Sequence, residues 1–250
     1  MGVPTAGGTA PGYGAAVTDP VQLTIEDGVA VVRLDDGKAN AVSHALIDQV
    51  HAALDAAQAD ATAVAFIGRE GKFSAGFDLS VMTQGADATR GLVKAGGELL
   101  MRVYTHPQPT VAAVTGHALA AGALLCLASD TRIGSADLPA KIGLNETAIG
   151  MGLPWYGIRL GEARLSVRHR QRSVLQAEIY DMAGALDAGY LDELVAADAV
   201  VDTAIERARQ LGQLPGHAYG FTKRRLRQVL ADEVLLGLDA DMETMVPPGS

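Results

Sequence analysis

Residues 107–134 read PQPTVAAVTGHALAAGALLCLASDTRIG, and this stretch decides the fold class. It predicts a buried strand at 110–114, entered through two prolines, then a glycine-containing turn and a short buried helix over AGALLCLAS. The following DTRIGS predicts a second strand. A buried strand, a helix and a further strand in succession are typical of a parallel sheet with both faces covered. The sequence therefore predicts an α/β fold.

The same alternation extends toward the N-terminus. The runs QLTIED and VAVVRLD, separated by Gly28, predict a hairpin. Ser43 is a candidate N-cap for a helix, and TAVAFIG predicts another buried strand. A second helix is expected over 87–104.

Beyond Pro154 the strand pattern nearly disappears. Helices are predicted for five segments: 161–169, 173–183, 200–211, 218–230 and 232–245. We therefore divide the chain into a flexible tail, an α/β core and a C-terminal helical region, with the bounds 1–20, 21–190 and 191–250.

Composition excludes several classes of function. The chain has 250 residues and a net charge of −9, which argues against nucleic acid and an anionic membrane as partners. A single cysteine, Cys126, precludes an intrachain disulfide. No apolar run approaches the roughly 20 residues of a membrane helix, and the N-terminus lacks a secretory signal. The six histidines show no metal-ligand spacing. We expect a cytoplasmic protein without a metal.

One carboxylate, Glu146, lies in the mostly apolar stretch AKIGLNETAIGMGLP at 140–154. Burial would raise its pKa toward the range useful for proton transfer at neutral pH. Two glycine-containing turns, FSAGFDL at 73–79 and GHALAAG at 116–122, can each present backbone N–H groups to a ligand. One acid and two such turns are suited to removing a proton beside a carbonyl and stabilising the enolate. A surface acid in a loop is the alternative interpretation.

Two clusters of positive charge occur, RHRQR at 168–172 and KRRLR at 223–227. A solvated helix face is the default interpretation of each cluster. A contact with a phosphate group is the alternative.

Four segments together resemble the crotonase superfamily, the enoyl-CoA hydratase/isomerase family. They are GKANAVS (37–43), GREGKFSAGFDL (68–79), the stretch at 107–134 and IGLNETAIGMGLP (142–154). The resemblance implies a superhelical core of ββα units with a C-terminal helical region used for trimerisation. It also implies an acyl-CoA thioester as the ligand, no cofactor beyond this CoA, and a homotrimer or a dimer of trimers.

The resemblance also implies roles for individual residues. The backbone N–H groups of Phe77 and Ala121 form the oxyanion hole, and Glu146 is catalytic. The CoA contacts are Lys38 and Lys223, the second reaching the CoA of a neighbouring subunit. The substrate pocket is lined by Ala75, Met82, Gly122 and Leu124.

One departure from the family pattern favours an isomerase. Hydratases of the family use two glutamates to position water, and the first of these maps onto Leu124, while the second maps onto Glu146. The segment at 142–154 looks closer to the Δ3,Δ2-enoyl-CoA isomerases, which use one glutamate here. We expect an enzyme of fatty-acid metabolism that shifts a double bond. Two alternatives stay open: a hydratase in which Glu98 or Asp137 substitutes, and a non-catalytic acyl-CoA binding protein.

Overall fold

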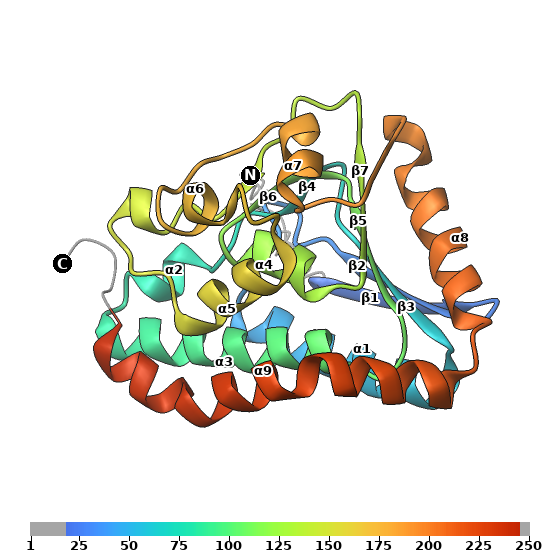
Figure 1. Cartoon of the computed structure of the whole chain (residues 1–250), viewed down its shortest axis with the longest axis horizontal. Coiled ribbons are helices and arrows are strands. Elements are labelled where there is room, and N and C mark those ends of the chain that lie inside the picture. The colour runs from blue at the N-terminus through green and yellow to red at the C-terminus, as the bar shows by residue number, and fades with distance from the viewer. Residues whose placement is uncertain (1–18, 246–250) are drawn as a thin grey trace, which may run out of the picture.

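The computed structural model describes residues 19–245 and contains, within them, two β-sheets and a set of packed helices (Figure 1). The predicted tail at 1–20 lies almost entirely outside the described residues. The main sheet consists, in spatial order, of β1 (Val21–Glu26), β2 (Val29–Leu34), β3 (Ala63–Ile67), β5 (Thr110–Val114), β7 (Thr131–Ser135) and β9 (Glu193–Val195).

The pairing of this sheet follows from the sequence pattern. β1 and β2 form the predicted antiparallel hairpin, and every later pairing in the sheet is parallel. All five residues of β3 are buried, because alternate side chains enter two separate hydrophobic clusters. A parallel sheet with both faces covered requires such continuously apolar strands.

A second, smaller parallel sheet lies against the main one. Its strands β4 (Gly71–Ser74), β6 (Gly116–Leu119) and β8 (Ile142–Gly143) pair in this order. These strands have only two to four residues, and no apolar alternation identified them in the sequence. They supply the framework of the site described below.

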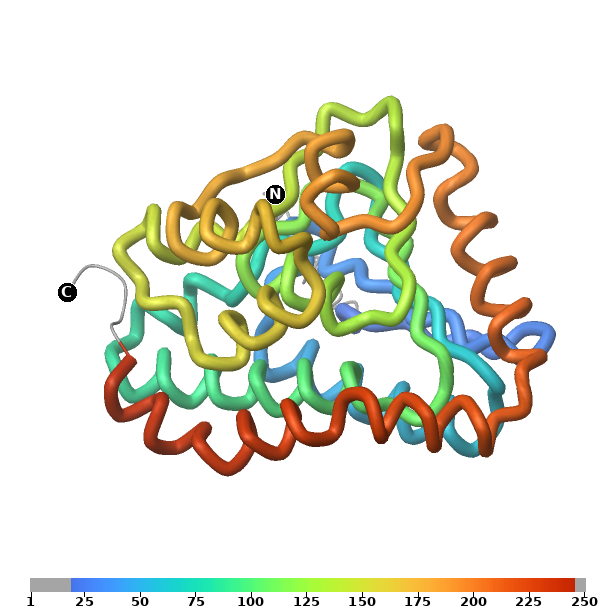
Figure 2. Tube along the Cα trace, viewed as in Figure 1, coloured from blue at the N-terminus to red at the C-terminus, as the bar shows by residue number. Residues whose placement is uncertain are grey.

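Helices cover both faces of the main sheet (Figures 1 and 2). One face packs against α8, and the other packs against the layer that contains α1, α3 and the wholly buried α4. The long α9 runs beside α3 on the outside of that layer. The helices are α1 (His44–Asp60), α2 (Leu79–Met82), α3 (Ala86–Thr105), α4 (Ala121–Ala128), α5 (Trp155–Arg164), α6 (Arg170–Val174), α7 (Met182–Ala188), α8 (Val200–Gly212) and α9 (Gly216–Thr244), with 3₁₀ turns η1 (Thr147–Ile149) and η2 (Ala197–Ala199).

Several local predictions are confirmed. The Ser43 side chain accepts a hydrogen bond from the N–H of Leu46 and caps α1, as a serine at this position favours. The buried strand at 110–114 and the buried helix after it form β5 and α4.

Other predictions for the C-terminal part were wrong. The helix expected at 173–183 ends with α6 at Val174, because the following backbone pairs with β8 through Tyr180 and Ile142. The two helices expected at 218–230 and 232–245 form the single helix α9. The strand β9 was not anticipated, and both β9 and α8 pack onto the main sheet beyond the boundary drawn at residue 190.

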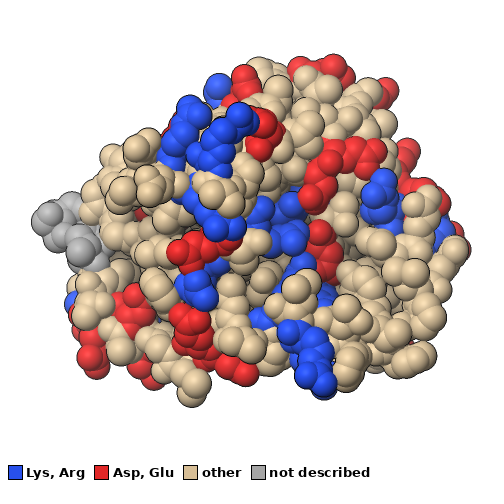
Figure 3. All heavy atoms as spheres, viewed as in Figure 1, with Lys and Arg blue, Asp and Glu red and all other residues tan. Residues whose placement is uncertain are grey.

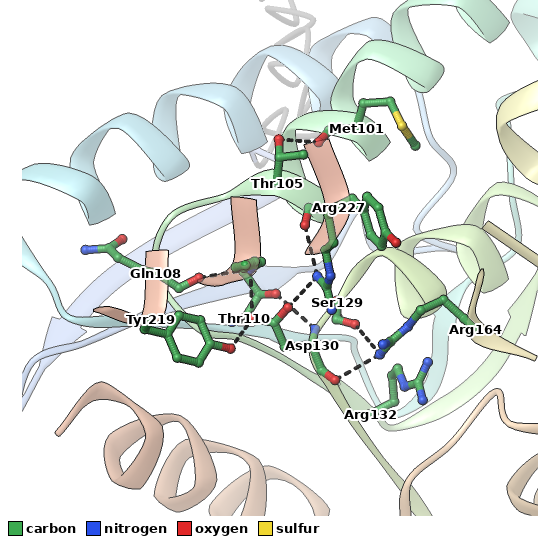
Figure 4. Close-up of polar contacts among 12 residues, drawn as sticks. Met101, Thr105, Gln108, Thr110, Ser129, Asp130, Arg132, Arg164, Tyr219 and Arg227 are labelled. Carbon is green, nitrogen blue, oxygen red and sulfur yellow. Dashed lines mark hydrogen bonds and ion pairs between the residues drawn. The ribbon is translucent and has the colours of Figure 1, made fainter. Parts of the chain in front are cut away.

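A buried charge cluster joins α9 to the sheet (Figure 4). Oδ2 of Asp130 accepts hydrogen bonds from Nζ of Lys223 and the hydroxyl of Tyr219, both at 2.7 Å. Its Oδ1 accepts from Nη1 of Arg227 at 2.5 Å. The N–H of Thr110 in β5 donates to the same carboxylate. One carboxylate therefore neutralises two cations of α9 and holds that helix against the start of β7.

Candidate active site

Three parallel strands of the small sheet end side by side, and each is followed by one candidate site residue. β4 pairs with β6 near Ala118, and β6 pairs with β8 at Leu119 and Gly143. Phe77 follows β4, Ala121 follows β6 and Glu146 follows β8. The carboxyl ends of neighbouring parallel strands lie at one edge of a sheet, where ligands of α/β proteins commonly bind. The fold thus brings the predicted catalytic acid and both predicted oxyanion donors to the same edge of the small sheet.

The peptide between Gly76 and Phe77 has a defined direction. The N–H of Val42 donates to the carbonyl of Gly76 at 2.8 Å, and the N–H of Asp78 donates to the carbonyl of Val42 at 3.1 Å. Because a trans peptide is planar, the N–H of Phe77 points away from the Gly76 carbonyl and therefore away from Val42. Gly76 has a φ of +96°, which suits glycine. The Phe77 N–H is thereby available to a ligand.

The turn before α4 presents the second N–H. Ala120 has a φ of 49° and a ψ of −125°, a conformation that L-residues rarely adopt. Ala121 is the first residue of α4, so its N–H belongs to the group of N-terminal donors that have no acceptor within the helix. The positive end of the helix dipole adds to the attraction for a developing oxyanion.

Glu146 has the surroundings expected of a proton-transferring acid. Its side chain is buried, with 3% of the residue exposed, and its Oε2 has no hydrogen-bond partner among the described residues. Burial raises the pKa of this carboxyl to about 7. The N–H groups of Ile149 and Met151 both donate to the Glu146 carbonyl and hold the turn that carries the side chain. The alternative of a surface acid in a loop is wrong.

The predicted substrate-pocket residues separate into two groups. Leu124 and Met82 are buried in the apolar core that surrounds the small sheet. A methyl group on Gly157 would lie 3.5 Å from Leu124, so this leucine packs against α5. Gly122 lies against the backbone carbonyl of Ser74, where its missing side chain permits helix α4 to approach β4. Ala75 is exposed at the cleft described next.

A cleft of about 560 Å³ opens beside the oxyanion turn, and it contains three predicted residues: Lys38, Ala75 and Phe77. The loop that carries Lys38 is shaped by Asp36, whose carboxylate accepts hydrogen bonds from the N–H groups of Lys38, Asn40 and Ala41. Burial alone would raise the pKa of Asp36, but these donors and Arg69 lower it overall. No motif in the sequence had indicated this role of Asp36.

Asn40 completes this loop. It has a φ of 52°, and its side-chain amide donates to the carbonyls of Leu34 and Phe73. These bonds connect the end of β2 with β4. An asparagine tolerates a positive φ and could have indicated the tight loop.

Lys223 does not join this cleft. Its ammonium is buried between Asp130 and the carbonyl of Gln108, and burial lowers its pKa to about 8. Its contact with the CoA of a neighbouring subunit stays a prediction. The interpretation of KRRLR as a solvated face is wrong for Lys223 and Arg227, which are both buried.

The other charged candidates are exposed or partly exposed, except for His169 of RHRQR, which is buried. In RHRQR, Arg168 pairs with Asp187 and Arg172 pairs with Glu178. The face drawn in Figure 3 shows acidic side chains interspersed with basic ones. Glu98 and Asp137, the possible substitutes for a hydratase glutamate, are both exposed. Their exposure argues against a water site shared with the buried Glu146.

Two tyrosines near Glu146 were not singled out from the sequence. Tyr156 is fully buried, and its hydroxyl donates to the carbonyl of Val93 at 3.1 Å. Tyr190 is equally buried. The nearby Glu146 charge adds to the effect of burial in raising the pKa of both phenols, so both remain neutral and polar at physiological pH.

Comparison with known proteins places these features in context. A family model described as enoyl-CoA hydratase/isomerase matches residues 24–247. Human mitochondrial enoyl-CoA delta isomerase 1 is 32% identical over 224 residues, covering 88% of this chain and 74% of that protein. A probable enoyl-CoA hydratase of Mycobacterium avium is 32% identical over 219 residues, covering 84% of each. A solved enoyl-CoA hydratase/isomerase family protein from Pseudomonas syringae matches with a TM-score of 0.89 and 40% identity, covering 92% of this chain and all of that one.

Proposed function

The chain belongs to the enoyl-CoA hydratase/isomerase family, and we propose that it shifts a double bond in an enoyl-CoA thioester rather than hydrating it. The family membership confirms the resemblance and the fold class predicted from the sequence. Relatives carry both reaction names, so the choice between the reactions rests on the site. The observation that carries the proposal is the burial of Glu146, together with the equally buried Leu124, onto which the resemblance maps the second glutamate of the hydratases.

The proposed reaction uses one acid twice. The thioester oxygen accepts hydrogen bonds from the N–H groups of Phe77 and Ala121, which makes the C2 protons of a 3-enoyl thioester more acidic. Ionised Glu146 removes one C2 proton and leaves a dienolate whose negative charge lies on the thioester oxygen. The protonated Glu146 then returns the proton at C4, and the double bond ends between C2 and C3.

The apolar surroundings of Glu146 support isomerisation over hydration. A bound water needs about two to four polar partners, whereas Leu124 offers none. Leu124 and Leu153 both lie beside Gly157, so the surroundings of Leu124 are apolar as well. Exclusion of water protects the dienolate and strengthens the interactions of the oxyanion hole.

We propose that the acyl-CoA enters through the cleft with Lys38 near its phosphates, and that the protein assembles as a trimer or a dimer of trimers. The outer face of α9 supports assembly, because its exposed apolar side chains would be costly in contact with water. They are Phe221, Leu226, Val229, Leu235 and Leu236. A monomeric mass in light scattering at micromolar concentration would contradict the assembly.

Product identification tests the reaction. The protein is incubated with a 3-enoyl-CoA and, separately, with a 2-enoyl-CoA, and the products are identified by mass spectrometry and NMR. We expect the 2-enoyl-CoA from the first substrate and little 3-hydroxyacyl-CoA from the second. Efficient hydration of the second substrate would favour the hydratase. Binding without either reaction, and without exchange of the C2 hydrogen with solvent, would favour the acyl-CoA binding protein.

A further inference from the structure

Two adjacent glycines, Gly96 and Gly97, occupy the middle of the 20-residue helix α3. Glycine inside a helix is less stable than alanine, so a pair of glycines in mid-helix indicates that close packing requires them. Each glycine faces one aromatic ring. A Cβ on Gly96 would meet the ring of Phe77, and a Cβ on Gly97 would lie 2.7 Å from the ring of Tyr156.

The contact at Gly96 involves Phe77, the residue whose N–H is the first predicted donor of the oxyanion hole. A Cβ there would lie 2.5 Å from Cζ of Phe77 and closer still to Cε1, distances that real Cβ atoms do not show. The far edge of the ring therefore rests on the helix backbone in a notch that only glycine leaves open. Any larger residue at position 96 would force the ring to move.

Phe77 is partly buried, and further apolar residues lie close to it. Behind it lies an apolar gap of about 10 Å³, close to the minimum that holds a single water molecule and without the polar partners that a water needs. Phe77 is also among the residues that line the open cleft. The gap is otherwise lined by Val42, Leu46, Leu99, Leu100, Ala121 and Leu125. Phe77 thus lines both the cleft and an apolar gap in the core.

Backbone hydrogen bonds with Val42 hold this segment on both sides of the Gly76–Phe77 peptide, and the position of the ring adds a further constraint. Gly76 has no side chain, and its left-handed conformation lies in a region that glycine crosses freely. On the Gly76 side, the hydrogen bond from Val42 fixes the carbonyl. On the Phe77 side, the position of the ring limits rotation about the N–Cα bond. Both constraints together determine where the Phe77 N–H points.

We propose that Gly96 is a positioning residue, whose notch seats the Phe77 ring and thereby aims the Phe77 N–H at the thioester oxygen. This inference rests on the proposed function only in that the ligand is an acyl-CoA thioester. It does not depend on whether the reaction is isomerisation or hydration. Since a displacement near 1 Å can cost about a hundredfold in rate, a methyl group at position 96 should impair catalysis without touching the substrate.

The test compares Gly96→Ala, Phe77→Leu and the double variant. Leucine lacks the Cε and Cζ atoms that meet the notch, so the double variant fits the added methyl group where the single variant does not. We expect Gly96→Ala to lower kcat by about 10- to 100-fold with a smaller change in KM. Phe77→Leu should lose activity to a lesser extent, and the double variant should recover most of the loss of Gly96→Ala.

A spectroscopic readout separates this inference from the proposed reaction. Butanoyl-CoA labelled with ¹³C at the thioester carbon cannot isomerise, and hydrogen bonds to its oxygen shift the bound carbonyl resonance downfield. We expect the wild type to show this shift, Gly96→Ala to lose part of it and the double variant to regain it. A wild type that does not bind the probe, or binds it without a shift, contradicts the proposed acyl-CoA site and the inference with it. A shift that Gly96→Ala retains overturns the inference alone.

Gly91→Ala is the matched control, because Gly91 lies in the same helix and a Cβ there meets no atom within 4 Å. It should leave kcat and the carbonyl shift unchanged. If it lowers both as Gly96→Ala does, the effect belongs to the helix and the inference fails. If thermal melting shows that Gly96→Ala does not fold, Phe77→Leu provides the test instead. An undiminished carbonyl shift in Phe77→Leu would show that the ring does not position the N–H, and would overturn the inference.

Discussion

The N–H of Ala120 donates to the carbonyl of Gly143 at 3.0 Å, and this bond joins the turn of the second oxyanion donor to the strand that leads to Glu146. The two elements that must act on one thioester are therefore fixed to each other through the backbone. Ala120 reaches this position in a conformation with φ 49° and ψ −125°. Such a backbone costs about 1–3 kcal/mol in a residue other than glycine.

Replacing Ala120 with glycine should therefore stabilise the fold. Relief of the strain outweighs the greater flexibility that glycine gives the unfolded chain, and we expect the free energy of unfolding to rise by about 1 kcal/mol. Urea denaturation measures the change. Ala123→Gly, inside α4, is the matched control and should be destabilising, since its backbone is helical. Equal effects of the two variants would show that Ala120 is not strained.

Glu146→Gln keeps the shape of the side chain and removes the base. Turnover of a 3-enoyl-CoA should fall by about 10²–10⁴-fold, the usual contribution of a positioned acid or base. Exchange of the C2 hydrogen with deuterated solvent should be lost as well, while the affinity for a saturated acyl-CoA changes little. Asp137→Asn and Glu98→Gln serve as controls and should retain turnover, because both side chains are exposed. Retained turnover in Glu146→Gln would assign the base to another residue.

Leu124→Glu should not produce a good hydratase, although it restores the second glutamate of the hydratase pattern. Leu124 has no exposed surface and packs toward Leu153 and Gly157. A carboxyl group there would be protonated or misdirected, and it would further oppose ionisation of Glu146. We expect hydration of a 2-enoyl-CoA to stay far below isomerisation in this variant. Comparable rates of the two reactions would mean that a single side chain decides the chemistry.

The Asp130 cluster provides a prediction about stability. Asp130→Asn leaves Lys223 and Arg227 buried without their common counter-charge, and we expect a loss of about 3–5 kcal/mol in the free energy of unfolding. Denaturant unfolding followed by circular dichroism measures it. Asp239→Asn removes an exposed partner of Lys94 and should change the free energy of unfolding little. Similar losses of unfolding free energy in the two variants would show that the cluster does not hold α9 in place.

The sequence predicted those features that depend on local pattern. The buried strand before α4, the Ser43 cap and the burial of Glu146 among apolar neighbours each follow from a few adjacent residues. The short strands β4 and β8 could not be predicted in this way, because Ile142–Gly143 has no periodicity of its own and becomes a strand by pairing with β6. The three-stranded framework of the site is thus a product of tertiary contacts.

Contacts between distant segments explain the remaining failures. Lys223 and Arg227 are four residues apart on a helix, a spacing that looks the same on a solvated face and on a buried one. Only the position of Asp130, more than 90 residues earlier, makes the buried face possible. Likewise, Gly96 acquires a role only because the ring of Phe77 rests on it. No window of the sequence contains both members of such a pair.

The raised pKa of Glu146 makes a prediction about how stability depends on pH. Burial raises this pKa from the ordinary 4.5 to about 7 in the folded protein. Between these two values the folded chain keeps a proton that the unfolded chain loses, so the free energy of unfolding contributed by this group falls as the pH rises. Above pH 7 the cost approaches about 3.5 kcal/mol, from a shift of about 2.5 pKa units at roughly 1.4 kcal/mol per unit.

The glutamine in Glu146→Gln cannot ionise, so the variant does not lose unfolding free energy as the pH rises. We expect the variant and the wild type to have similar stabilities near pH 4.5, and the variant to become progressively more stable than the wild type up to about pH 7.5. Urea unfolding at several pH values measures the difference. In the wild type, kcat/KM for a 3-enoyl-CoA should rise over the same pH range, because only the ionised carboxylate accepts the C2 proton. A stability difference that does not vary with pH would mean that Glu146 titrates normally, and the rise in kcat/KM would then have to come from a different group.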